Sequence, residues 1–161
     1  MTRDDAHASR ATRYLARWRA MNARQRWQCM VALWQLPLIR LSLRLFGFRK
    51  TQRMWADVAL SQPGPCDPEQ RIRLAHATAD AIALAARRRW VRANCLPQSL
   101  LLVRMLRRLG IHPVLRLGAR QSEAIGFEAH AWVELDGVEI GAGSLGHAPF
   151  VGPRAASSAD H

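Results

Sequence analysis

The chain has 161 residues, about the length of one domain, and a hydrophobic fraction of 49%, which excludes a fully disordered or fibrous protein. Its 24 Lys and Arg residues outnumber its 12 Asp and Glu residues, and every one of these cations except Lys50 is an arginine. The resulting net charge of +12 fits either an acidic partner, which guanidinium groups bind in bidentate fashion, or a well-solvated surface.

Cysteine and histidine spacing excludes two further classes of protein. The three cysteines form no CxxC pair, so we expect no disulfide framework, and no histidine lies at metal-ligand spacing. The N-terminus, MTRDDAHASR, contains two aspartates and no apolar segment, so it does not resemble a signal peptide. The apolar stretch at 31–46 is interrupted by Pro37 and two arginines and is too short to cross a bilayer. We therefore expect a soluble, cytoplasmic protein that needs no metal or cofactor.

Residues 11–46 are rich in helix formers and predict two helices that meet near Pro37, where the missing N–H ends or kinks a helix. An apolar stripe recurs there at helical spacing, formed by Trp27, Met30, Val31 and Trp34. The stripe fits a helical subdomain that packs against the rest of the chain, or a helix that contacts a membrane or a partner protein. The loop at 62–68, QPGPCDP, contains Cys66, which we interpret as an incidental thiol.

Two further helices are predicted in the middle of the chain. The first begins with a proline and spans 68–86, and the second, at 94–109, has the strongest helical pattern in the sequence. Asn94 is a favoured N-cap, and Pro97 falls within the first turn, where its missing N–H causes no loss. Gly110 supplies the C-terminal stop.

After the last helix, the hydrophobic period changes from helical to alternating. The predicted strands are 114–117, 127–135 and 138–140. Asp136-Gly137 is a strong hairpin turn between the second and third strands. Helices followed by an antiparallel meander predict an α+β fold. We divide the chain into an N-terminal helical region at 1–62, a core at 63–152 and a disordered tail at 153–161.

Two segments carry groups that are suited to acyl transfer. Cys95 lies at the predicted start of the 94–109 helix, where unpaired N–H groups and the helix dipole favour the negative charge of a thiolate and of an oxyanion. His130 lies on the predicted strand at 127–135, from which an imidazole can pair with the thiolate and protonate a leaving amine. The alternative interpretation is a buried structural cysteine and a structural histidine.

The stretch RRRWVRANCLPQSLLLVRMLRRLGIHPVLRLGAR, followed by GFEAHAWVEL, resembles the transglutaminase-like leader peptidases of lasso peptide biosynthesis. That family has a cysteine at a helix start, a long Leu- and Arg-rich helix, and an HAW strand with a glutamate two positions later. The match covers about residues 86–150. It implies a papain/transglutaminase-like core with the cysteine helix packed on a small antiparallel sheet. In this core, Cys95 attacks a peptide carbonyl as the nucleophile of a cysteine endopeptidase, and His130 assists.

The resemblance also implies partners. Some family members begin with a small winged-helix-like domain that binds the leader peptide, and this sequence shows no such pattern. The chain is therefore similar to the stand-alone C-terminal protease form of the family's B protein. Such a protease acts on a lasso precursor peptide, together with a separate PqqD-like leader-recognition protein and an asparagine-synthetase-like cyclase. Because no nucleic-acid-binding motif is readable, we expect no nucleic-acid partner.

The family's third catalytic residue is an aspartate on the strand after HAW, which orients the histidine. A three-residue turn would place Ala142 opposite His130, and a two-residue turn would place Gly143 there, so neither register supplies a carboxylate. Glu128, two residues from His130 on the same face, is the candidate orienting acid, and Glu139 shares that face only in the two-residue register. The missing aspartate favours a second hypothesis, a catalytically impaired binding module that docks an acidic leader or partner through its basic surface.

Overall fold

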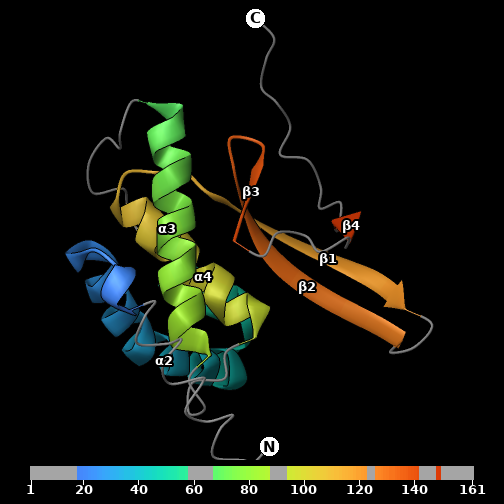
Figure 1. Ribbon diagram of the computed structural model, residues 1–161. Coiled ribbons are helices and arrows are strands. Elements are labelled where there is room, and N and C mark those ends of the chain that lie inside the picture. Colours follow the sequence, from blue (N-terminus) through green and yellow to red (C-terminus); the bar gives the residue numbers. More distant parts are fainter. Residues whose placement is uncertain (1–17, 58–66, 88–93, 123–125, 142–147, 150–161) are drawn as a thin grey trace, which may run out of the picture.

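The computed structural model describes residues 18–57, 67–87, 94–122, 126–141 and 148–149. Three long helices come first: α2 (Ala23–Trp55), α3 (Pro68–Ala86) and α4 (Cys95–Arg108). An antiparallel sheet follows, in the order β3-β2-β1-β4, formed by β1 (Val114–Ser122), β2 (Gly126–Leu135), β3 (Val138–Ile140) and β4 (Ala148–Pro149). Helices α3 and α4 lie between α2 and the sheet (Figure 1). The predicted α+β fold is confirmed, while the tail predicted at 153–161 lies outside the described residues.

Helix α2 continues through Pro37 and breaks at Gly47, so the predicted boundary at the proline is wrong. Gly47 has a φ of 73° and a ψ of 178°, a conformation that only glycine adopts at little cost. Pro37 removes one hydrogen bond from the helix. Leu36 and Ile39 beside it are fully buried, and their packing holds the helix together across the proline.

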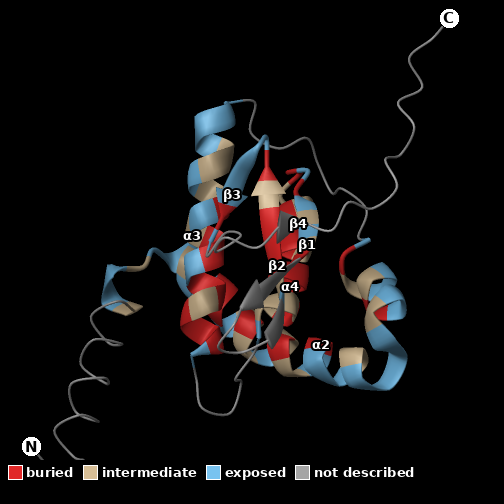
Figure 2. Cartoon of the chain, turned by 90° about the vertical axis from the view of Figure 1, so that its right-hand side faces the viewer, coloured by how far each residue is buried: buried red, intermediate tan, exposed pale blue. Residues whose placement is uncertain are grey.

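Helix α2 is apolar on two opposite faces. Its inner face is buried and consists of Cys29, Ala32, Leu36 and Ile39. Its outer face is exposed and repeats every three or four residues, through Trp27, Met30, Trp34, Leu38, Leu41 and Leu45. Trp27 and Trp34 are 71% and 73% exposed, so most of the predicted stripe faces solvent. Figure 2 shows exposed residues beside buried ones along α2. The apolar stretch at 31–46, expected to be too short to cross a bilayer, lies in a helix of 33 residues, and by length and composition alone this helix is long and apolar enough to do so.

All three helices and the sheet contribute to one buried core. Its large side chains include Leu36 and Ile39 from α2, Ile82 from α3, Leu100 and Leu106 from α4, and Val133 and Leu135 from β2. A buried hydrogen bond of 3.0 Å, from the Gln28 amide to the Thr78 hydroxyl, joins α2 to α3. Helix α2 thus packs directly on the helices of the predicted core, and the division at residue 62 stays a prediction.

The strand register follows from a two-residue hairpin turn, as the Asp136-Gly137 pair predicts. Leu135 pairs with Val138 across the turn, and the two turn residues have φ values of 50° and 81°, which a type I′ turn requires. Arg71 on α3 donates to the Asp136 carboxylate at 2.9 Å and fixes the hairpin tip against that helix. Strand β4, which pairs with β1, was not predicted because two residues are too few to show alternation.

Candidate active site

Cys95 is the first residue of α4, at the position predicted from the sequence. Asn94 occupies the N-cap position with extended φ and ψ, but its side chain makes no capping hydrogen bond. A capping side chain bonds the N–H of the second or third helical residue, and here the third is Pro97, which has no N–H. The predicted N-cap residue is therefore confirmed, and Pro97 removes one of the two donors that its side chain could have bonded. The helix ends before Gly110, whose φ of 72° agrees with the predicted stop.

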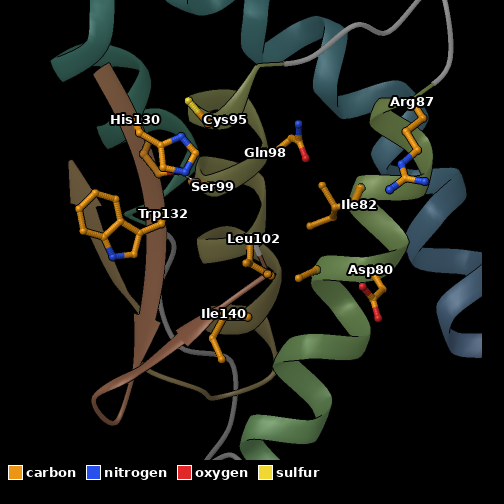
Figure 3. A pocket seen from close by; sticks show the side chains of 14 residues that line it. Asp80, Ile82, Arg87, Cys95, Gln98, Ser99, Leu102, His130, Trp132 and Ile140 are labelled. Atoms are coloured by element: carbon orange, nitrogen blue, oxygen red, sulfur yellow. Dashed lines mark hydrogen bonds between the residues drawn. The ribbon is translucent and has the colours of Figure 1, made fainter. Parts of the chain in front are cut away.

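One face of α4 points into a cavity of about 420 Å³. This face carries Cys95, Gln98, Ser99 and Leu102, which occupy positions i, i+3, i+4 and i+7 of one helix face. Strand β2 supplies another wall through His130, Ala131 and Trp132, and α3 supplies the wall across from it, including Asp80, Ile82 and Arg87 (Figure 3). The structure thus brings Cys95 and His130, far apart in the sequence, to the same cavity.

A buried hydrogen bond joins the cysteine helix to the histidine strand. The Ser99 hydroxyl, one turn after Cys95, donates to the backbone carbonyl of Ala131 at 3.0 Å. Ser99 is only 7% exposed, so this bond is shielded from competing water. Since Ala131 directly follows His130, the bond sets the position of the thiol's helix relative to the imidazole's strand.

His130 is half-buried, and its ring stacks against Trp132. The two ring centroids are 6.2 Å apart and the planes differ by 16°. Because they are two residues apart on β2, both side chains leave the same face of the strand. Trp132 is 5% exposed, so it presents a fixed surface beside the imidazole. Sequence analysis did not identify it as part of the site.

The described residues place none of the sequence's candidates for the third catalytic position beside His130. The side chain of Glu128 lies outside the described residues, as do Ala142 and Gly143. The two-residue turn puts Glu139 on the face of β3 that matches the His130 face, but Glu139 pairs with Glu134, four residues further along β2. At about 3.3 Å per residue, this separation is roughly 13 Å.

One carboxylate does line the cavity among the described residues. It belongs to Asp80, which lies on α3 across the cavity from His130 (Figure 3). Arg87, at the end of α3, is the cationic group of the same wall. The sequence contained no signal for either residue, because only the packing of α3 against α4 brings them to the thiol.

Of the other two cysteines, Cys29 does not line this cavity. Cys29 is fully buried in the core under α2, and Cys66 lies outside the described residues. Among the described residues, no group of three or more His, Cys, Asp or Glu side chains is arranged to hold a metal ion. The chemistry that the cavity offers is therefore that of a helix-start thiol, an imidazole and polar side chains such as Gln98.

Comparison with known proteins assigns the chain to a superfamily. Residues 35–151 match the sequence profile of the Transglutaminase-like superfamily. This range includes α3, α4 and all four strands, with both Cys95 and His130. No curated protein and no solved structure matches the chain significantly. Members of the superfamily are generally cysteine peptidases or transglutaminases. Because the profile spans most of the chain, the protein belongs to the transglutaminase-like superfamily.

Proposed function

We propose that this protein is a cytoplasmic cysteine peptidase that removes the leader peptide from a ribosomally synthesised lasso peptide precursor. It would act with a separate leader-recognition protein and an asparagine-synthetase-like cyclase, as the resemblance of residues 86–150 implies. The observation that carries the proposal is the shared cavity of Cys95, at the start of α4, and His130 on β2. Superfamily membership supports the same class of chemistry.

The proposed reaction is acyl transfer through the thiol. The Cys95 sulfur, as thiolate, adds to the scissile carbonyl carbon, and the carbonyl oxygen becomes an oxyanion. First-turn N–H groups of α4 that have no partner inside the helix, including that of Cys95, would stabilise this oxyanion. His130, as imidazolium, protonates the departing amine and leaves a thioester. A water molecule, deprotonated by His130, then hydrolyses the thioester and restores the thiol.

The direct test uses the precursor peptide, the recognition protein and mass spectrometry of the products. We expect Cys95→Ala and His130→Ala each to lower kcat/KM at least about a thousandfold. Both side chains are only partly buried, so the thermal midpoint should stay close to that of the parent protein. Parental cleavage by either variant would refute the proposed mechanism.

A binding module is the second candidate function. Its support is that the described carboxylate of the cavity, Asp80, lies across from His130 rather than beside it, together with the net charge of +12. On this hypothesis the protein binds an acidic leader or partner without cutting it. Binding of the precursor by the parent protein, with no product formed in the complete system, would favour this function over the peptidase.

The outer face of α2 is the surface that we propose for the leader-recognition protein. It presents two largely exposed tryptophans in an apolar stripe, on a helix that contains arginines and a lysine but no acidic residue. A contiguous apolar surface of this kind is typical of a docking site. The cations complement a partner whose apolar surface is bordered by carboxylates, as expected of a protein that works with this basic chain.

The docking proposal predicts that the partner raises kcat/KM by presenting the substrate at high effective concentration. Trp27→Gln combined with Trp34→Gln should remove most of this stimulation. Met54→Gln, which changes an exposed apolar residue of α2 outside the stripe, should keep it. Equal stimulation of the double variant and the parent would refute the surface. If the double variant no longer binds anionic lipid vesicles but is still stimulated by the partner, the stripe is instead a membrane-binding surface.

A further inference from the structure

A second cavity, of about 570 Å³, lies between α2 and the first turn of α4. Its lining residues are Pro37, Arg40, Leu41, Leu43 and Arg44 from α2, and Asn94, Leu96 and Pro97 from α4. Asn94 and Leu96 are the residues directly before and after Cys95, which itself lines the first cavity. The first turn of α4 therefore separates two cavities, with the thiol on one side and its chain neighbours on the other.

The lining of this second cavity, the α2–α4 groove, combines apolar surface with positive charge. Arg40 and Arg44 are one helical turn apart and lie on the same side of α2. Among the described residues, the lining of the groove includes leucines and prolines but no carboxylate. Guanidinium groups bind carboxylates through paired, charge-assisted hydrogen bonds. The first turn of α4, which forms the opposite wall, adds the positive end of a helix dipole.

A peptide whose scissile bond lies over Cys95 can continue past this first turn into the groove, because the residues on either side of Cys95 line it. We propose that the α2–α4 groove binds the substrate on that side of the scissile bond and selects a peptide with an acidic side chain, flanked by apolar residues, within a few positions of the cleaved bond. The inference rests on the proposed peptidase function and adds the class of substrate. In this site Arg44 and Arg40 bind the carboxylate, while Leu41, Leu43 and Leu96 contact the apolar neighbours.

The test uses internally quenched peptides, each with one Glu at a different position in a neutral sequence, and a twin with Gln at that position. At one or two positions, we expect the Glu peptide to have a kcat/KM about tenfold above its twin, a typical effect for a partly exposed charge-assisted contact. The preference should appear in KM, because the groove does not contact the reacting atoms. Arg44→Gln should abolish the preference. Arg44→Lys should keep part of it, because lysine retains the positive charge but lacks the planar fork of the guanidinium group.

The matched control is Arg53→Gln, which removes the same charge from an exposed position on α2 outside the groove. It should leave the Glu preference intact. If Arg53→Gln lowers the preference as much as Arg44→Gln, net charge rather than the groove is responsible and the proposal is wrong. A parent protein that cuts Glu and Gln twins equally well overturns the groove but leaves the peptidase function standing.

A second readout does not depend on turnover. Peptides that occupy the site should slow the alkylation of Cys95 by iodoacetamide, as measured by mass spectrometry. In the parent protein and in Arg53→Gln, we expect the preferred Glu peptide to protect Cys95 more strongly than its Gln twin does. In Arg44→Gln, the two peptides should protect Cys95 equally. Such protection without cleavage supports the groove and counts against the peptidase. If neither protection of Cys95 nor cleavage depends on the Glu residue, the proposal that the groove binds an acidic side chain is wrong.

Discussion

The hydrogen bond from Ser99 to the Ala131 carbonyl should matter more for catalysis than for stability. Ser99→Ala removes one buried hydrogen bond of 3.0 Å, which costs about 1 kcal/mol of unfolding free energy. In a domain of this size, such a loss lowers the thermal midpoint by roughly 2–4 °C. Because a typical domain is stable by about 5–15 kcal/mol, nearly all of the variant protein stays folded.

The same bond sets the distance between the first turn of α4 and His130, so its loss should misplace the thiol. Misplacement of about 1 Å can cost a factor of roughly 100 in rate. Here the core still packs α4 on β2, and we expect kcat to fall about tenfold, or about 1.4 kcal/mol of barrier. The KM should change little, because Ser99 donates to the chain itself. Unfolding cannot explain a tenfold loss when so little of the protein is unfolded.

Ser42→Ala is the matched control. The Ser42 hydroxyl accepts a hydrogen bond of 3.2 Å from the Trp55 indole, within α2 and away from the thiol. Its loss should lower the thermal midpoint by a similar amount and leave kcat at the parental value. The assay is cleavage of precursor peptide under saturating conditions, with the midpoint measured in parallel. The positioning argument fails if Ser99→Ala retains parental kcat, or if both serine variants lose kcat equally.

Three further predictions follow from burial and geometry. Cys95 should be alkylated by iodoacetamide far faster than Cys29, which is fully buried; equal rates measured by peptide mass mapping would contradict the placement of Cys95 in an open cavity. Glu128→Gln should lower kcat about tenfold or more if Glu128 orients His130, and should leave kcat unchanged otherwise. Leu36→Ala should lower the unfolding free energy by about 2–5 kcal/mol in one cooperative transition, because Leu36 is fully buried in the core; a separate low-temperature transition would show that α2 unfolds alone.

Local signals in the sequence predicted the parts of the fold that depend on neighbours in the chain. The proline at the first position of α3, the stop at Gly110 and the Asp136-Gly137 pair each fix backbone geometry by themselves, and the structure agrees with all three. The break in α2 was assigned to Pro37 because a proline is the stronger local signal. Tertiary packing of Leu36 and Ile39 overrides it, and that packing is not readable from spacing alone.

The residues of the candidate site also fall into two groups, those that local sequence predicts and those that only tertiary packing brings together. The position of Cys95 at a helix start follows from local sequence, and Gln98 and Ser99 could have been found from their three- and four-residue spacing to it. The placement of Cys95 and His130 in one cavity depends on long-range packing, and it was expected mainly from family resemblance rather than from spacing in the sequence. The wall formed by α3 and the α2–α4 groove depend on helix packing, so no sequence signal predicted them.

The uncapped start of α4 connects these observations. Asn94 would normally bond first-turn N–H groups and neutralise the positive end of the helix. Pro97 removes one of the two usual capping donors, and the Asn94 side chain makes no capping bond. First-turn donors near Cys95 are therefore left to other acceptors, between a cavity that contains the thiol and a groove that contains two arginines. A substrate that crosses this turn would bring an oxyanion to the donors and a carboxylate to the arginines. A bound anionic peptide would therefore supply acceptors to first-turn donors that water otherwise satisfies.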